Sequence, residues 1–393
     1  MQQLPYPVWL LAAAQALGMC AAPMIILIGG IIGVGLAPSP EWATLPIASI
    51  VIGSATASIP AAMIMKRVGR RMGFIGATLV ALLGSILAYS SIQNSNFWGL
   101  CFSIGLLGIH VAFVAQFRFA ALEWVDGTKA AQAASVVLLG GLIAAFVGPE
   151  IGIIGKGLFS QAFSGSFVLL ACIYCGLLVL LWIMPFADMK QSDTTSAGRP
   201  IRELIKLPSI GAAIAAGAIG YGVMSLIMTA TPVSMTKIQS FALEESKTVI
   251  QSHILAMFLP SLFTAYIFKL IGLRGMMLTG LIAMCIAMTV ALVGQSYLNY
   301  WFALVFLGIG WNFLYVSGTA LLTQSYEQQE SFKMQAVNEG FVFSFQASMS
   351  LLSGWLVFQF GWFALNISAL LILLIALGFI GRWLIYERKA AMA

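Results

Sequence analysis

Charged residues are scarce in this sequence. Only 8% of its 393 residues are charged, whereas 61% are hydrophobic. A soluble globular domain carries about 25% charged and about 45–50% apolar residues, and its charged side chains lie on the surface. The shortage of charge therefore excludes a water-soluble fold of this length and predicts a protein embedded in a lipid bilayer.

Histidine and cysteine are also few, with two and five copies. All five cysteines lie in apolar runs without the spacing of zinc ligands, so we expect small, buried hydrophobic residues. There is no nucleotide-binding loop and no catalytic-triad spacing, and the glycine-rich stretch 29–33 lies in an apolar run, where it favours helix packing. We therefore expect no metal, no cofactor, no enzymatic activity and no ATP-driven pumping.

Long hydrophobic runs are what the chain has in abundance. A membrane-spanning helix needs about 20 apolar residues, and the longest polar break, at 188–208, leaves six such runs on each side. The sequence predicts an all-α integral membrane protein whose twelve transmembrane helices form two pseudo-symmetric six-helix bundles, 1–187 and 209–393, joined by a cytoplasmic linker at 188–208. The predicted spans are 8–35, 42–65, 72–92, 97–121, 131–154, 164–186, 209–231, 247–268, 275–294, 299–323, 333–358 and 361–385.

Lysines and arginines gather in alternate loops. When successive loops are assigned to opposite sides of the membrane, Lys156, Lys237 and Lys247 fall on one side and nearly all other cations on the other. Positive residues mark the cytoplasmic side, so we expect both termini and the linker to be cytoplasmic in a multi-pass membrane protein. The net charge of +6 is then a signal of topology and not of nucleic-acid binding.

The two halves of the chain repeat each other. The string Leu107–Phe113 in the fourth span matches Leu307–Phe313 in the tenth, and the basic break Lys66–Arg71 has a weaker counterpart in Lys269–Arg274. Internal repeats of this kind place a substrate site between the halves, near the middle of the membrane.

These features together resemble the major facilitator superfamily of transporters. Its signature is six plus six spans with a basic Arg-x-Gly-Arg-Arg break after span two, here Arg67–Arg71. The family pattern has a Gly and an Asp before that break, where this chain has Ala62 and Lys66. The missing acid implies that the usual lock of this loop against span eleven is modified. The element Gly148–Gly152, with Gly140 and Ala144 upstream, resembles span five of the family's drug/proton antiporters.

A narrower resemblance concerns a bacterial branch of the superfamily that includes riboflavin transporters. It rests on the strings 116–121, 148–150, 310–313 and 318–323. The resemblance implies a monomeric secondary active transporter of the bacterial inner membrane. It would move a small, planar aromatic, flavin-like solute by alternating access and be coupled to protons. A drug or siderophore transporter of the same superfamily is the alternative, and a non-transporting receptor is a remote one.

Ionisable and aromatic residues inside the spans are the candidates for substrate binding. His110 and Arg118 are eight residues apart in span four, which predicts a shared helix face; snorkelling or an ion pair at the cytoplasmic end is the alternative for Arg118. Trp311 and Tyr315, four apart on span ten, suit a planar solute, although aromatic residues more often pack in the core. The full predicted set is Gln15, Met19, His110, Arg118, Tyr221, Trp311, Asn312 and Tyr315.

Three further residues are candidates for proton coupling: Glu150, His253 and Glu339. Glu150 follows the Gly-Pro element, expected here to break the helix, and we predict that it gains and loses a proton beside His253, in the outer third of the membrane. The alternative is a carboxylate that faces water close to Lys156. If Glu150 does not carry the proton, Glu339 in span eleven is the next candidate.

The basic break predicts a cytoplasmic gate made of Lys66, Arg67, Arg70, Arg71 and Glu123. We expect Arg67 and Arg71 to pair with Glu123, which lies at the cytoplasmic end of span four, because charge-assisted pairs there would close the inner side. Lys66 is expected to approach Glu339 in place of the missing family lock. A solvated loop acid is the alternative for Glu123.

Overall fold

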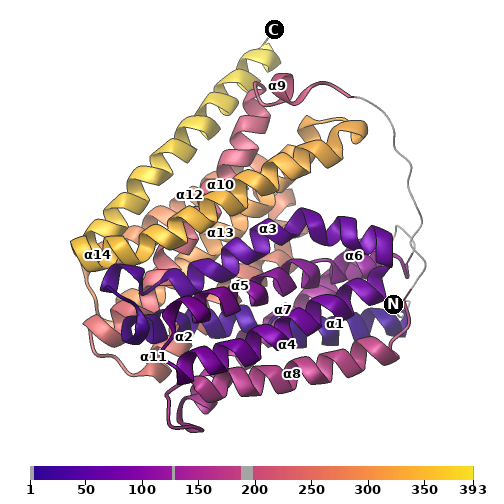
Figure 1. Cartoon of the computed structure of the whole chain (residues 1–393). Coiled ribbons are helices and arrows are strands. Elements are labelled where there is room, and N and C mark those ends of the chain that lie inside the picture. The colour runs from indigo at the N-terminus through magenta and orange to yellow at the C-terminus, as the bar shows by residue number, and fades with distance from the viewer. Residues whose placement is uncertain (1–3, 126–128, 187–197, 393) are drawn as a thin grey trace. The chain divides into compact units, whose positions relative to one another are not determined.

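The computed structural model describes residues 4–125, 129–186 and 198–392 (Figure 1). Throughout these residues the secondary structure is helical, without a strand. The predicted all-α membrane fold is therefore confirmed. The predicted linker lies partly outside the described residues, and its last part contains the short helix α9 (Ile201–Leu204).

The chain divides into two compact units, and the first comprises 1–191 together with 242–247. In it α3 packs on α5, α4 lies between α5 and α8, and α1 and α2 pack on α7 (Figure 1). Its helices are α1 (Tyr6–Gly18), α2 (Ala21–Leu36), η1 (Pro40–Trp42), α3 (Leu45–Val68), α4 (Arg70–Gln93), α5 (Phe97–Val114), α6 (Phe117–Leu122), α7 (Ala130–Ile154), η3 (Gly155–Gly157) and α8 (Ser164–Ile183).

The second unit comprises 192–241 and 248–393, so the boundary at 247/248 falls inside helix α11. In this unit α10 packs against α13 and α14, and α12 packs against α13. Its helices after α9 are α10 (Pro208–Val233), the π-helical turn η4 (Ser234–Ile238), α11 (Leu243–Phe258), η5 (Leu259–Phe263), α12 (Thr264–Val293), α13 (Tyr297–Ser325), η6 (Gln328–Glu330) and α14 (Ser331–Met392).

Ten helices in the described residues are long and apolar enough to cross a membrane. The longest, in α14, holds the predicted eleventh and twelfth spans, which a turn at Gly361 separates. The predicted eighth span is divided among α11, the 3₁₀ turn η5 around Pro260 and the start of α12. Pro260, which has no backbone N–H to donate, lies within this interruption. Eleven of the twelve predicted spans thus lie in the ten long apolar helices, and the eighth is the interrupted one.

The turns after spans two and eight have the same backbone conformation. Gly69 has φ 83° and ψ 162°, and Gly272 has φ 67° and ψ 177°. Only glycine adopts this region readily, because a Cβ would clash with the backbone. The two basic breaks that match in sequence therefore also turn the chain in the same way.

The matched glycines of spans four and ten also have equivalent packing roles. A Cβ on Gly108 would lie 2.2 Å from the Ile50 carbonyl oxygen of α3, and one on Gly308 would lie 2.7 Å from the His253 carbonyl oxygen of α11. Each glycine lets the fourth span of its half pack closely on the second. The repeat in the sequence is thus matched by repeated helix packing.

The Gly-Pro element does not break its helix as expected, because α7 runs unbroken through Pro149. A Cβ on Gly148 would lie 2.5 Å from the Cys20 carbonyl oxygen, and one on Gly140 would lie 2.2 Å from that of Ala12. Helix α7 thus uses its small residues to pack closely on the first span. Its motif therefore explains helix packing and not a break in the helix before Glu150.

The prediction that the cysteines are buried is wrong for three of them. Cys20 and Cys101 are buried, whereas Cys172, Cys175 and Cys285 are exposed. Hydrophobic side chains cover the outside of a membrane protein as well as its core, so an apolar run does not tell which of its faces is inside.

Candidate functional site

Three predicted substrate residues of the second unit come together as one cluster of aromatic rings. The rings of Trp311 and Tyr315 stack on α13 with centroids 5.2 Å apart and an interplanar angle of 8°. Tyr221 of α10 meets both edge-on, at 4.9 Å from Trp311 and 5.4 Å from Tyr315. The sequence did not single out Phe258 of α11, whose ring lies 6.2 Å from Trp311. Stacked and edge-on contacts are the favourable geometries for aromatic pairs.

The cluster is partly accessible. Trp311 is 4% exposed and its indole N–H has no hydrogen-bond partner, whereas Tyr221 and Tyr315 are both partly exposed. An aromatic solute can therefore stack on a tyrosine ring while Trp311 supports it from behind. Burying a hydrogen-bond donor without a partner costs about 1–3 kcal/mol of folding free energy. A solute that offers an acceptor to the Trp311 N–H would therefore recover this cost on binding.

Asn312 lies beside Trp311 but its amide is used differently. Its Nδ2 donates to the carbonyl oxygen of Met257 at 2.7 Å and to Oγ of Ser261 at 2.5 Å. The side chain thus ties α13 to the interrupted eighth span. Its buried Oδ1 has no partner, so the predicted role of Asn312 in substrate binding now rests on that oxygen alone.

The predicted residues of the first unit lie around the end of α1. Gln15 is buried with no partner for its Oε1, and Met19 is the partly exposed residue directly after α1. His110 of α5 is buried beside Gly18 and close to the backbone of Ala77, and neither of its ring nitrogens makes a hydrogen bond of standard geometry. Its ring meets that of Tyr174 edge-on at 4.9 Å, a contact that the sequence did not indicate. The Tyr174 hydroxyl is also without a partner, so unsatisfied polar groups gather here.

The expectation that His110 and Arg118 share the face of one continuous helix is wrong. Helix α5 ends at Val114 and α6 begins at Phe117, and the N–H of Gln116 binds the carbonyl oxygen of Phe113 three residues earlier. A tighter turn of this kind rotates the following residues relative to the preceding helix. Arg118 instead places its guanidinium 4.7 Å from the ring centre of Phe119, while its buried Nε has no hydrogen-bond partner.

The predicted gate contains one ion pair, but with a different arginine. Arg70 donates from Nε and Nη2 to Oε1 of Glu123 at 3.1 and 2.9 Å. The pairing expected for Arg71 is wrong, because its Nη2 donates to the Met184 carbonyl oxygen at 2.7 Å. Arg67 is exposed and its expected pairing is also wrong, since the ion pair of Glu123 is with Arg70. The side chains of Arg67 and Arg70 point in different directions because the turn at Gly69 places Arg67 in α3 and Arg70 in α4.

The expected contact of Lys66 with Glu339 stays a prediction. Lys66 is exposed in the last turn of α3, in the first unit. Glu339 is partly exposed in α14, in the second unit.

The proton-coupling candidates have partners that the sequence did not indicate. Oε1 of Glu150 accepts a hydrogen bond from Lys247 Nζ at 2.7 Å, and the side chains are 47% and 18% exposed. His253 is buried, and its Nδ1 donates to the Leu304 carbonyl oxygen at 2.7 Å. The prediction that Glu150 and His253 act together is not tested by these contacts, but Lys247 joins the candidates because its charge neutralises that of Glu150.

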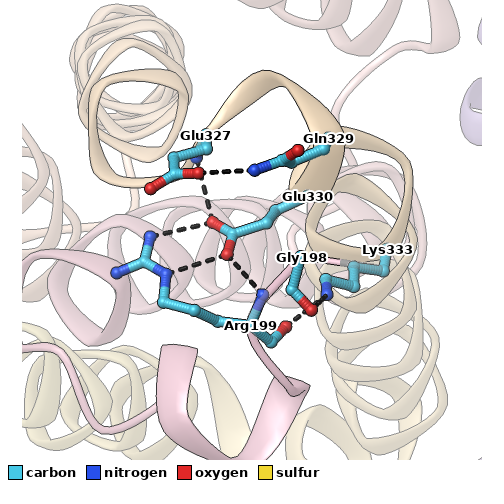
Figure 2. Close-up of polar contacts among 6 residues, drawn as sticks. All are labelled: Gly198, Arg199, Glu327, Gln329, Glu330 and Lys333. Carbon is cyan, nitrogen blue, oxygen red and sulfur yellow. Dashed lines mark hydrogen bonds and ion pairs between the residues drawn. The ribbon is translucent and has the colours of Figure 1, made fainter. Parts of the chain in front are cut away.

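A second ion-pair cluster lies between the end of the linker and the loop after α13 (Figure 2). Glu330 is buried, and Arg199 donates to it from Nε and Nη2, each at 2.8 Å. These hydrogen bonds lower the pKa of Glu330 to about 2 and raise the pKa of Arg199. The sequence did not indicate this pair, because 131 residues separate its members.

In the described part of the chain, no three His, Cys, Asp or Glu side chains come together as a metal site. The available chemistry is that of ring stacking, hydrogen bonding and buried or half-buried ion pairs. Such groups can bind and release a solute or a proton.

Comparisons with known proteins place the chain among transporters. It is 32% identical over 360 residues to the riboflavin transporter RfnT of Brucella anthropi, which covers 91% of this chain and 90% of that protein. It is 28% identical over 378 residues to the uncharacterised MFS-type transporter YddS of Bacillus subtilis, covering 91% of this chain and 86% of the relative. No family model matches the chain.

Solved transporter structures have the same fold. The POT family transporter PepTSo superposes with a TM-score of 0.75 at 12% identity, over 100% of this chain and 99% of the other. A bacterial homologue of the human lysosomal transporter Spinster gives a TM-score of 0.73 at 12% identity, over 98% and 96% of the two chains.

Proposed function

The chain belongs to the major facilitator superfamily of membrane transporters, and from that premise we propose that it carries a small, planar aromatic, flavin-like solute across the bacterial inner membrane by alternating access. The observation that carries the proposal is the ring cluster of Tyr221, Trp311 and Tyr315. The similarity to a named riboflavin transporter over nine-tenths of both chains supports the same class of solute.

Polar groups supply the remaining contacts in this proposal. The unsatisfied groups of Gln15, His110 and Asn312 bind the carbonyl and N–H edge of a flavin, because each has a buried atom without a partner. Met19 adds a polarisable contact to the ring system. Arg118 attracts anionic or carbonyl-rich parts of the solute.

Purified protein titrated with riboflavin tests the substrate class, with quenching of flavin fluorescence as the signal. Tyr315→Leu removes a stacking ring and should weaken binding by about 1–3 kcal/mol, or about 5- to 150-fold. Tyr315→Phe retains the ring and should bind within a few fold of the unchanged protein. Trp182→Leu is the matched control, because Trp182 is 70% exposed and far from the cluster in sequence.

Counterflow of labelled riboflavin in proteoliposomes completes the test. Exchange in the unchanged protein and its loss in Tyr315→Leu support transport through this site. Absence of both binding and counterflow would refute the flavin-like solute. A thermal-shift screen of drugs and siderophores then identifies the alternative class, because a ligand of the folded state stabilises it.

We further propose that Glu150, helped by His253, couples transport to protons. Glu150 is paired with Lys247 when ionised, so protonation of the carboxylate would release the lysine. Glu150→Gln should abolish uptake driven by an imposed pH gradient while sparing riboflavin binding and counterflow. His253→Ala should shift the pH profile without silencing transport. If Glu150→Gln retains full dependence on the gradient, the proton passes elsewhere, and Glu339 is tested next.

The proposed inner gate consists of the Arg70–Glu123 pair and an approach of Lys66 to Glu339. Cysteines at 66 and 339 should form a crosslink in the state that is closed to the cytoplasm, and crosslinking should then stop counterflow until a reductant is added. Failure to crosslink in any state would remove this contact from the gate.

We propose both termini on the cytoplasmic side and a monomer as the transporting unit, surrounded by lipid.

A further inference from the structure

The ion pair of Arg199 and Glu330 connects the helices that carry the ring cluster. Arg199 lies just before α9, and the next helix, α10, carries Tyr221. Glu330 lies in η6, directly after α13, which carries Trp311 and Tyr315. The pair therefore joins the chain that enters α10 to the chain that leaves α13, within the second unit.

The hydrogen-bond capacity of the Glu330 carboxylate is fully used. Its Oε1 accepts from the backbone N–H and Nε of Arg199, both at 2.8 Å, and its Oε2 accepts from Nη2 of Arg199 at 2.8 Å and from the Glu327 N–H at 2.9 Å (Figure 2). A buried carboxylate is tolerated only with such partners. Because Arg199 contributes a backbone group as well as its planar guanidinium, the pair fixes the main chain at this position.

Lys333, in the first turn of α14, reinforces the same connection. Its Nζ donates to the carbonyl oxygen of Gly198 at 2.9 Å and also to that of Arg199 (Figure 2). The end of the linker is thus held from two sides. Glu330 binds the backbone N–H and the guanidinium of Arg199, and Lys333 binds the carbonyl oxygens of Gly198 and Arg199.

The first unit uses its corresponding charges differently. There Glu123, which follows span four, pairs with Arg70 of the basic break after span two. In the second unit Arg274, in the matching break, pairs with Glu387 of α14 at 2.8 Å. Glu330, which follows span ten, is left for the arginine of the linker. The repeated halves have therefore acquired different ionic connections at matching ends of their helices.

We propose that Arg199 and Glu330 are positioning residues for the substrate site: their pair holds the start of α10 against the end of α13 and so keeps Tyr221 in edge-on contact with Trp311 and Tyr315. This inference rests on the proposed function, because it takes the three rings to be the binding surface for the solute. Tyr315 lies ten residues before the end of α13, which is about 15 Å along an uninterrupted helix. A change of helix direction at the pair therefore displaces the rings.

The variant Glu330→Gln tests the proposal, because it keeps the shape of the side chain and removes the charge. If the aligned arrangement of rings falls to about 10–30% of the population, the apparent Kd for riboflavin rises about three- to tenfold. Arg202→Gln is the matched control, since Arg202 is an exposed arginine three residues from Arg199. It should leave the Kd unchanged.

A disulfide then separates positioning from a general loss of stability. A Cβ on Gly198 would lie 3.3 Å from Cγ of Gln329, within bonding reach of a cysteine at 329, but only 2.5 Å from Cγ of Glu330. The cysteine pair 198/329 is therefore made in the Glu330→Ala background, which lacks that Cγ, with the native cysteines replaced. Oxidation should then restore the Kd, and a reductant should remove the gain. A Kd that stays within twofold in Glu330→Gln, or that oxidation does not restore, would overturn the proposal.

Hydrogen exchange provides a readout that does not depend on the substrate. Loss of the pair should speed amide exchange around Tyr221 in α10 and Trp311 in α13, while α5 in the first unit stays unchanged. Unchanged exchange around both rings would overturn the positioning role. If the unchanged protein fails to bind riboflavin but Glu330→Gln speeds this exchange, the flavin-like solute is wrong and the positioning role stands.

Discussion

The close packing of α5 on α3 in the amino-terminal unit predicts a large effect for one methyl group at Gly108. In Gly108→Ala the added Cβ would lie 2.2 Å from the Ile50 carbonyl oxygen and 3.0 Å from Cα of Gly53, whereas ordinary contact begins at 3.4 Å. Both obstacles are backbone atoms, so α3 and α5 must separate by about 1 Å. Overpacking of this kind costs about 1–3 kcal/mol, and at about 2–4 °C per kcal/mol for a unit of this size the apparent Tm should fall by about 2–12 °C.

The measurement is thermal unfolding of detergent-solubilised protein, followed by fluorescence-detected size exclusion. Gly176→Ala is the matched control, because Gly176 lies in helix α8 with no atom within 4 Å of an added Cβ. Alanine there should leave the Tm unchanged or raise it slightly, since it is the better helix former. Gly308→Ala, at 2.7 Å from its obstacle, should cost less than Gly108→Ala. Equal Tm values for Gly108→Ala and Gly176→Ala would refute the argument from close packing.

Two further predictions concern the ion pairs. The pKa of Glu330 is lowered from 4.5 to about 2 in the folded protein, so its pair with Arg199 stabilises the fold fully above about pH 4.5, and this contribution is lost as the pH falls toward 2. Acid unfolding of Glu330→Gln should lack that part of the pH dependence. An acid transition equal to that of the unchanged protein would contradict the assignment. In the gate, Glu123→Gln and Arg70→Gln should each slow counterflow by a similar factor, and the exchanged pair Arg70→Glu/Glu123→Arg should recover part of the lost rate. Arg67→Gln should have little effect on counterflow. An equal loss in Arg67→Gln would show that total positive charge, and not the specific pair, closes the cytoplasmic end.

The sequence by itself determined the membrane class, the number of spans and the repeat. These follow from the length and order of apolar runs, because a bilayer requires about 20 apolar residues for each crossing and leaves few other solutions. The matching basic breaks Lys66–Arg71 and Lys269–Arg274 were visible as well, because they separate apolar runs at corresponding places in the two halves. Trp311 and Tyr315, four residues apart, were correctly placed side by side for a similar local reason.

Only the tertiary structure decided which charges pair. Arg70, Arg71 and Arg67 lie within five residues, and the direction of each side chain depends on the turn that separates α3 from α4. The partners Lys247 for Glu150 and Arg199 for Glu330 are 97 and 131 residues distant in the chain.

The faces of the helices were undecided for the same reason. Lipid is as apolar as the protein core, so hydrophobicity does not tell the exposed cysteines of α8 from buried ones. For the same reason it does not tell a continuous fourth span from one that turns at Gln116. Local periodicity and composition fix where a helix crosses the bilayer. Its rotation, its interruptions and its ionic partners are fixed by the helices that pack against it.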